Sequence, residues 1–317
     1  MSSYRIVDRL TLDSAAERNA LIAGLFARPA TIPPKYFYDE LGCALFCAIC
    51  ELPEYYPTRT EVAIFSEHRD EIADAVGKGR QLVDLGAGDC CKAASWLPYF
   101  QPARYLAVDI ARAPINKALS ALAPEFPEIE MLGVVTDFAR KLDIGAELAP
   151  LPATFFYPGS SIGNFSPDEA LSFLRQIRGH CTMPGSGLLI GVDAKKDRIR
   201  LEAAYDDAVG VTAAFNRNVL AHVNRVVGAD FRPAEFIHRG LYNEEAGRIE
   251  MHLEARSAQR VTIDGRARTF EAGERIHTEN SYKYSPGDFE ALLRKAGFAS
   301  IRLWQDRDRQ FNVFYAQ

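Results

Sequence analysis

The sequence lacks the features of several large classes of protein. No apolar run reaches the 18 residues of a membrane-spanning helix, and the first residues, Met1–Asp13, hold no apolar segment typical of a secretory signal. The net charge of −5 comes from interspersed signs, so no basic surface for nucleic acid or for a membrane is indicated. Internal repeats and low-complexity segments are also missing. We therefore expect a cytoplasmic monomer without a nucleic-acid or membrane partner.

The middle of the chain alternates short apolar runs with helical segments. At 317 residues the chain can bury one large core or two smaller ones. We expect strands at 81–85, 104–109, 129–135, 154–157 and 187–193, and helices at 92–99, 113–122, 167–179 and 286–296. This alternation predicts an α/β fold with a doubly wound, mainly parallel sheet. The runs 300–306 and 310–315 predict a terminal antiparallel hairpin.

Two other regions do not fit that sheet. Helical spacing is found at 12–30, 41–50, 57–76 and 197–228, whereas 235–241, 248–255 and 259–263 alternate with period two, as antiparallel strands do. We assign residues 59–195 and 285–317 to the sheet domain. Residues 8–58 and 196–284 are assigned to an inserted α+β domain that binds the substrate.

A candidate cofactor site follows the first strands of the sheet. The segment Asp84–Asp89 contains Gly86 and Gly88, which let the backbone approach a ligand at the carboxyl ends of the strands. Asp109 ends the second strand, where a carboxylate can accept both hydroxyls of a ribose. Asp137 and Phe138 follow the third strand, where they can bond the amino group of an adenine and cover its ring.

The glycine spacing distinguishes between two adenosine cofactors. Dinucleotide-binding folds place a third glycine three residues after the second, beneath a pyrophosphate. Cys91 occupies that position here. S-adenosylmethionine (SAM) has no pyrophosphate and does not require that glycine, so the pattern favours SAM over NAD.

The cysteines and histidines do not indicate a metal. Cys43, Cys47 and Cys50 have the spacing of the iron–sulfur motif of radical SAM enzymes. They fall on one stripe of a helix that also carries Leu45 and Ile49, and no barrel of strands follows, so we interpret them as buried, apolar side chains. Without a secretory signal, the six cysteines should be reduced thiols. The six histidines show no ligand spacing, and we predict no metal.

Seven stretches of the chain resemble, in the same order, those of the SAM-dependent histidine Nα-methyltransferases of ergothioneine biosynthesis. They are Pro34–Glu40, Leu52–Thr60, Gly159–Asn164, Ala204–Asp207, Gly210–Asn218, Arg248–Met251 and Glu279–Lys283. The resemblance implies a class I, Rossmann-like methyltransferase domain with a terminal hairpin. It also implies a substrate domain built from the N-terminal segment and a central insertion, with SAM as methyl donor and no metal.

The resemblance also implies roles for individual residues. SAM contacts are implied at Gly86, Lys92, Asp109, Asp137 and Phe138. Substrate contacts are implied at Tyr55, Asn164, Tyr205, Glu279 and Ser281, with Phe46, Gly159, Thr212 and Met251 lining the pocket. Tyr38 is implied to lie near the substrate amine and is the candidate catalytic residue. The sequence departs from the family at Cys43, Cys47 and Cys50, where the family has polar residues around the position of Phe46.

These residue types suit one reaction. Transfer of a methyl group from a sulfonium to an amine requires mainly that the two groups be held in line. Tyr38, acting through a water, can orient the amine as it loses its proton. Asn164 and Tyr205 can donate to an α-carboxylate, and Glu279 and Ser281 suit the two nitrogens of an imidazole. We therefore predict methylation of the α-amino group of L-histidine, in three successive transfers.

Two alternatives stay open. The same reaction on another amino acid, such as a tryptophan-type substrate, differs only in how the ring is recognised. A non-catalytic SAM-binding or NAD-binding module would share the cofactor site but would methylate nothing. Mass spectrometry of an amino-acid mixture incubated with SAM separates these alternatives from histidine methylation.

Overall fold

The structure, a computed structural model, describes residues 4–10 and 14–317 and contains two compact units. Of the described residues, unit 1 holds 4–10, 60–194 and 284–317, and unit 2 holds 14–59 and 195–283. Each unit has a sheet and a hydrophobic core of its own. Among the helices of the described ranges, none is long and apolar enough to cross a membrane.

Unit 1 is built on a mainly parallel sheet of eight strands. Their order is β1-β5-β4-β3-β6-β7-β14-β13, and only the terminal hairpin runs antiparallel to its neighbours. The sheet order reverses direction between β3 and β6, which is where open α/β sheets bind ligands. The strands are β1 (Tyr4–Asp8), β3 (Gln81–Leu85), β4 (Arg104–Asp109), β5 (Glu130–Val135), β6 (Ala153–Tyr157), β7 (Gly187–Asp193), β13 (Ile301–Gln305) and β14 (Phe311–Ala316). The expected class I methyltransferase fold is confirmed.

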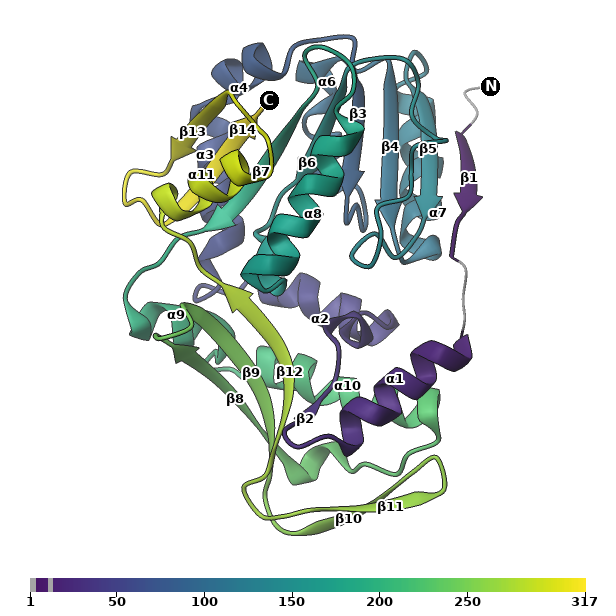
Figure 1. Ribbon diagram of the computed structural model, residues 1–317, viewed down its shortest axis with the longest axis vertical. Helices are drawn as coiled ribbons and strands as arrows, with labels where there is room; N and C mark the ends of the chain where they lie inside the picture. The colour runs from purple at the N-terminus through teal and green to yellow at the C-terminus, as the bar shows by residue number, and fades with distance from the viewer. Residues whose placement is uncertain (1–3, 11–13) are drawn as a thin grey trace. The chain divides into compact units, whose positions relative to one another are not determined.

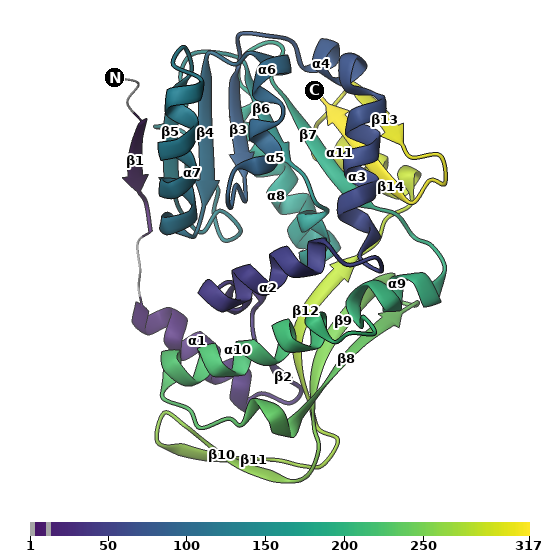
Figure 2. The same cartoon turned by 180° about the vertical axis from the view of Figure 1, so that it is seen from behind.

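Helices cover both faces of this sheet. Figure 1 shows α8 and α11 on one face, and Figure 2, seen from behind, shows α3, α5 and α7 on the other. The helices are α3 (Tyr56–Glu67), α4 (Arg69–Val76), α5 (Cys91–Ala94), α6 (Leu97–Phe100), α7 (Arg112–Glu125), α8 (Pro167–His180) and α11 (Pro286–Lys295), with the short η2 (Ser161–Asn164). The boundary between the units, after Arg59, falls inside α3.

Two expected helices of this region are each divided. The helix expected at 57–76 is interrupted at His68, and the one expected at 92–99 is two short helices, α5 and α6. Pro98 lies in the first turn of α6 and has no N–H with which to continue the hydrogen bonds of α5. Apolar residues recur at helical spacing on both sides of each break, so the sequence pattern does not indicate where the helices are interrupted.

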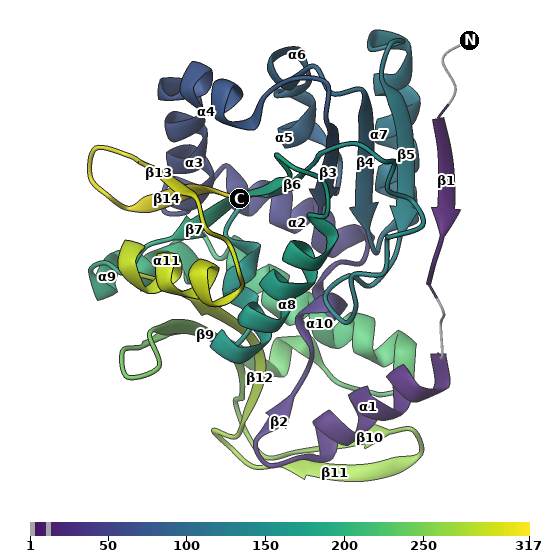
Figure 3. The ribbon, with the colours of Figure 1, turned by 45° about the horizontal axis from the view of Figure 1, so that its top comes forward.

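Unit 2 packs helices against one face of a smaller sheet. The sheet has the order β2-β12-β9-β8, and Figure 2 shows α2 and α10 on one of its faces. The elements are α1 (Ser14–Phe26), β2 (Ala30–Thr31), η1 (Pro34–Phe37), α2 (Glu40–Cys50), α9 (Arg198–Tyr205), α10 (Val211–Val227), η3 (Pro233–Glu235), β8 (Phe236–Asn243), β9 (Arg248–Ala255), β10 (Gln259–Ile263), β11 (Arg266–Phe270) and β12 (Arg275–Tyr282). The β10–β11 hairpin lies beside α1 in Figure 3, where Arg18 bonds Asp264 at 2.7 Å.

Several features of unit 2 differ from the sequence prediction. The helical region 197–228 is two helices: α9 ends at Tyr205, where Asp206 has an extended φ of −148°, and α10 begins after Gly210, which adopts a left-handed conformation (φ +82°). The cysteines of α2 do lie on a helix, but the prediction that they are buried is wrong: Cys47 is exposed, and Cys43 and Cys50 are only partly buried. The buried side of α2 carries Gly42 and Ile49 instead.

Candidate functional site

In unit 1, the predicted cofactor residues gather at the carboxyl ends of β3 and β4. Gly86 (φ +71°) and Gly88 (φ +53°) both have left-handed backbone conformations that favour glycine. The Asp109 carboxylate accepts the N–H of Gly88 at 2.9 Å and that of Ala111 at 2.8 Å. The loop after β3 and the end of β4 are thereby tied together, and burial raises the pKa of the Asp109 carboxyl.

Phe138 closes the same region from the end of β5. A Cβ atom built on Gly86 would lie 3.6 Å from the ring of Phe138, so the glycine loop and the ring are in contact range. Tyr157 and Phe173 pack against this ring, with centroids 6.1 Å and 5.9 Å away. A flat aromatic surface beside a glycine loop is suited to cover an adenine ring. Asp137 precedes the ring in the chain and follows β5.

A buried carboxylate that the sequence analysis missed connects two further predicted residues. Glu61 on α3 is fully buried; one of its oxygens bonds Lys92 Nζ at 2.7 Å, and the other accepts the N–H of Gly159 at 2.7 Å. Gly191 on β7 leaves the space for it, since a Cβ there would come within 2.0 Å of the Glu61 carboxylate. Glu61 thus fixes both Lys92 and the Gly159 loop. Its one sequence signal is that it directly follows the matched stretch Leu52–Thr60.

In unit 2, the predicted aromatic residues form one continuous cluster. Phe46 packs against Tyr38 and Tyr55, with ring centroids 5.9 Å and 6.4 Å away, and Tyr55 packs against Tyr205 at 6.1 Å. Phe215 on α10, which the sequence analysis did not single out, completes the cluster through contacts with Tyr38 and Phe46 at 6.1 Å. All of these contacts are edge-to-face except the one between Phe46 and Phe215, which is tilted, and edge-to-face packing is a geometry that aromatic pairs favour.

A polar set lies at the Tyr205 end of this cluster. The Tyr205 hydroxyl and Ser281 Oγ are 2.7 Å apart. Lys283, which is buried, donates to Ser281 at 2.7 Å and to Tyr205 at 3.1 Å. The two hydroxyls predicted to serve different ends of the substrate are therefore joined to one ammonium group. Lys283 belongs to a matched stretch but was not predicted to act in the site.

A β-bulge decides which face of β12 carries Glu279. The register shifts between His277 and Glu279, so that His277 pairs with His252 whereas Glu279 pairs with Met251. Met251 is buried on the helix-covered face of β9, and the bulge therefore turns Glu279 and Ser281 to that face. Burial raises the pKa of Glu279 to about 7, although the charge of Lys283 acts in the opposite direction.

Thr212, at the start of α10, is tied to Asp207. Its N–H bonds the Asp207 carboxylate at 2.7 Å. Despite partial burial, the pKa of Asp207 is lowered by hydrogen bonds that include one from the Thr212 side chain. The place of Thr212 in the substrate pocket stays a prediction.

The predicted residues are divided between the two units. Unit 1 holds Gly86, Lys92, Asp109, Asp137, Phe138, Gly159 and Asn164, which lies at the end of η2. Unit 2 holds Tyr38, Phe46, Tyr55, Tyr205, Thr212, Met251, Glu279 and Ser281. Within each unit the structure brings most of them into contact, and their contacts with cofactor or substrate stay predictions.

Removing the Asp109 carboxylate tests the cofactor residues of unit 1. We expect Asp109→Ala to weaken SAM binding by about 1.5–3 kcal/mol, because charge-assisted hydrogen bonds to the ribose are lost. Isothermal titration calorimetry with SAM measures this change. Asp143→Ala removes an exposed carboxylate of the same unit and should leave the affinity as it is. An unchanged affinity in Asp109→Ala, with the fold intact, would remove Asp109 from the site.

The raised pKa of Glu279 predicts a pH dependence of stability. Between the ordinary pKa of 4.5 and about 7, the folded chain holds a proton on Glu279 that the unfolded chain has released. This group's contribution to the free energy of unfolding therefore falls, by roughly 1–3 kcal/mol, as the pH rises through that window. Thermal unfolding of substrate-free wild type and Glu279→Gln should give a melting-temperature difference that changes between pH 4.5 and 7. Parallel curves would show that Glu279 keeps its ordinary pKa.

Comparison with known proteins identifies the family. The family of SAM-dependent, histidine-specific methyltransferases matches residues 17–317. Among the similar proteins, a histidine N-alpha-methyltransferase of Mycolicibacterium smegmatis is 40% identical over 98% of both chains, and one of Mycobacterium tuberculosis is 38% identical over 95% of this chain and 94% of that one. The ergothioneine biosynthesis protein 1 of Neurospora crassa is 30% identical over 87% of this chain and 32% of its own length. With its glycine loop, acidic strand end and polar set in place, the chain belongs to the family of SAM-dependent, histidine-specific methyltransferases.

Proposed function

We propose that this protein transfers methyl groups from SAM to the α-amino group of L-histidine, three times in succession, to give Nα,Nα,Nα-trimethyl-L-histidine. The observation that carries the proposal is the polar set of Ser281, Tyr205 and Lys283 at one end of an aromatic cluster, with the buried Glu279 within reach of the charge of Lys283. The family and the names of its Mycolicibacterium and Mycobacterium relatives support it. In this proposal unit 1 binds SAM, and unit 2 supplies the groups that select histidine.

The proton inventory of the polar set accounts for a preference for imidazole. A lysine ammonium can only donate, so Ser281 Oγ and the Tyr205 oxygen each accept from Lys283. If Tyr205 gives its proton to the substrate α-carboxylate, Ser281 must donate to Tyr205. The Ser281 oxygen is then left to accept the N–H of the imidazole.

Glu279 then serves the other ring nitrogen. Its pKa of about 7 is close to the ordinary imidazole pKa of about 6.5, so one proton can be shared between the two groups near neutral pH. A phenyl ring offers neither group a partner, and the indole of a tryptophan-type substrate offers only one N–H. Each buried polar group left unpaired costs roughly 1–3 kcal/mol.

The aromatic cluster suits an amine that gains methyl groups. Each transfer removes an N–H, so a site that held the amine through several direct hydrogen bonds would stop after the first product. Tyr38 and Phe46 offer ring surfaces instead, and cation–π attraction to a methylated ammonium contributes about 0.5–2 kcal/mol. Recognition of the carboxylate and the imidazole does not depend on the number of methyl groups. The substrate can thus stay bound in the same register through all three transfers, with Tyr38 orienting the amine through a water.

A product time course tests this function. With excess SAM, mass spectrometry should detect monomethyl-histidine and dimethyl-histidine in turn, and trimethyl-histidine as the final product. Fragmentation should place every methyl group on the α-nitrogen. An equimolar mixture that also contains tryptophan and phenylalanine should yield methylated histidine alone. Monomethyl-histidine as the final product, methylation of the ring, or preferred methylation of tryptophan would contradict the proposal.

The proposal extends to the pathway, the cellular location and the oligomeric state of the protein. The product is the betaine from which ergothioneine is made, and the similarity to an ergothioneine biosynthesis protein supports a place in that pathway. The cytoplasmic location and the monomeric state stay predictions of the sequence. Size-exclusion chromatography with light scattering measures the second of them, with a mass near 35.2 kDa expected for a monomer.

A further inference from the structure

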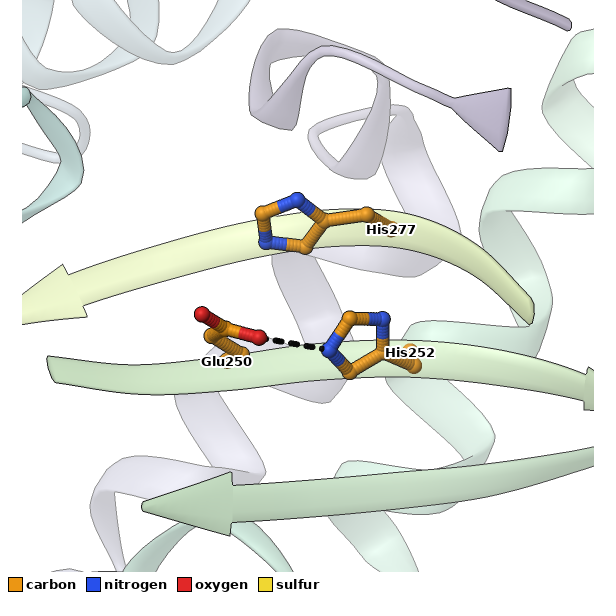
Figure 4. Close-up of side chains that lie close together, drawn as sticks. All are labelled: Glu250, His252 and His277. Carbon is orange, nitrogen blue, oxygen red and sulfur yellow. Dashed lines mark hydrogen bonds and ion pairs between the residues drawn. The ribbon is translucent and has the colours of Figure 1, made fainter. Parts of the chain in front are cut away.

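Two histidines and a glutamate meet on the face of the unit 2 sheet that is turned away from α10. Side chains of β9 alternate between the two faces; Ile249, Met251 and Leu253 are buried, whereas Glu250 and His252 point the other way. His277 on β12 pairs with His252 in the register and shares its face. Each of the three residues offers a ligand atom within 4.8 Å of the other two (Figure 4).

The three side chains are arranged as neighbouring ligands of one ion would be. His252 Nε2 lies 3.0 Å from a carboxylate oxygen of Glu250. Two ligand atoms about 2.1 Å from the same metal are separated by roughly 3–3.5 Å in octahedral or tetrahedral geometry. The imidazoles of His252 and His277 stack with centroids 4.8 Å apart, and Figure 4 shows the Glu250 carboxylate facing the edge of this pair.

The contacts of Glu250 leave one of its oxygens directed at the histidines. The first oxygen accepts from Arg248 and from Asn243, at 2.8 Å and 3.0 Å. The second oxygen lies 3.0 Å from His252 Nε2. An ion bound here would replace the proton shared between these two atoms, because metal ligands must be deprotonated.

We propose that Glu250, His252 and His277 bind a divalent transition-metal ion such as Zn²⁺, Co²⁺ or Ni²⁺, with water completing the coordination. Two imidazoles and a carboxylate are a ligand set that these ions accept, whereas Mg²⁺ and Ca²⁺ prefer oxygen alone. Asn280 lies opposite Glu250 in the register, and its side-chain oxygen is buried without a hydrogen-bond partner in the ranges described. It adds a polar atom on the same face. The methyl transfer itself needs no metal, so this site is separate from the chemistry.

The site is connected to the proposed histidine site through the bulge of β12. His277 Nε2 bonds the backbone carbonyl of Glu279 at 2.9 Å. Coordination of an ion through this nitrogen would release that carbonyl, and the Glu279 side chain is the proposed partner of the substrate imidazole. Resting on the proposed function, we expect a bound ion to weaken histidine binding and histidine to weaken metal binding by the same factor.

Titration of the substrate-free protein with Co²⁺, followed by visible absorption, tests the site directly. We expect one ion to bind with the d–d bands of nitrogen and oxygen ligands, and His252→Gln and His277→Gln each to weaken binding by at least about tenfold. His68→Gln is a matched control, because His68 lies 3.4 Å from Glu71 in a pair that has no second imidazole. It should leave Co²⁺ binding unchanged.

Binding of Co²⁺ to cysteine instead of histidine is the main alternative that this titration must exclude. Cys47 and Cys91 are exposed, and thiolates are also ligands of transition-metal ions. A sulfur-to-metal charge-transfer band that persists in both histidine variants would assign the binding to cysteine and refute the site, as would no binding at all. Circular dichroism and SAM affinity report whether the variants are folded. This measurement uses neither histidine nor turnover, so its failure is distinct from failure of the proposed function.

A second measurement tests the connection to the substrate. One equivalent of Zn²⁺ should raise the KM for histidine of the wild type and leave the SAM affinity unchanged, and His277→Gln should abolish the effect. If the ion binds but the KM does not change, the connection through the Glu279 carbonyl is refuted.

Discussion

Replacing Glu279 by alanine is expected to lower kcat/KM for histidine by roughly 10- to 150-fold, the factor that corresponds to the loss of a hydrogen bond of about 1.5–3 kcal/mol to a charged group. The carboxylate is the proposed partner of one imidazole nitrogen, and its position on β12 is set by the bulge before it. SAM affinity should stay the same, because the predicted cofactor residues belong to unit 1. Steady-state kinetics with histidine and calorimetry with SAM measure the two effects.

The variant should also change which amino acids are accepted. Tryptophan and phenylalanine offer nothing to a carboxylate, so removal of Glu279 should relax discrimination against them. Glu290→Ala is a suitable control, since Glu290 forms an exposed pair with Arg294 on α11. If Glu279→Ala still prefers histidine over both amino acids by the wild-type ratio, recognition of the ring lies elsewhere.

The sequence predicted the buried strands of unit 1 far better than the exposed elements. The predicted bounds 81–85, 104–109 and 187–193 are those of β3, β4 and β7. All residues of these strands except the last one of β4 are buried, so most of their side chains are apolar. β1, which is at the sheet edge and partly exposed, has no such run and was missed. β12 was missed because it carries charged residues and a bulge that breaks the alternation.

Only those site residues that follow directly after predicted parallel strands could be predicted from the sequence pattern. Gly86 and Asp109 follow from the rule that ligands bind at the carboxyl ends of parallel strands. Glu279 and Ser281 could be named only through resemblance to a family, since nothing in a polar stretch indicates which residues turn inward. Glu61 was missed because a glutamate in a helix is ordinarily exposed. In the structure it is fully buried, in space that is available because residue 191 on β7 is a glycine.

The histidines illustrate a limit of spacing arguments. Local spacing can identify ligands on one helix or loop, but His252 and His277 are far apart in the sequence and meet only through the pairing of β9 with β12. Glu250 precedes His252 by two residues, which places both on one face of a strand. The pattern is therefore visible in the sequence only once both strands and their register are known.

Lys283→Met is expected to have the largest effect on histidine recognition of any single substitution outside the residues named from the sequence. The methionine keeps most of the side-chain volume but removes the ammonium that donates to Ser281 and Tyr205. Both hydroxyls then lose a buried donor, and Glu279 loses a nearby positive charge. The two hydroxyls then no longer have fixed proton directions, and each proposed hydrogen bond to the substrate weakens by about 0.5–1.5 kcal/mol, so the KM for histidine should rise by roughly 5- to 150-fold.

The pH dependence of the variant distinguishes this role from simple packing. Without the positive charge of Lys283, the pKa of Glu279 should rise further above about 7, because the one interaction that lowers it is gone. The melting-temperature difference between Lys283→Met and the double variant with Glu279→Gln should therefore continue to change above pH 7, where the corresponding wild-type difference is constant. Lys141→Met, at an exposed pair with Asp143, should change neither KM nor the pH profile. If Lys283→Met binds histidine as the wild type does, the direction of the protons at Ser281 and Tyr205 is set by other groups. If its KM rises but its pH profile is that of the wild type, Lys283 acts by packing rather than by its charge.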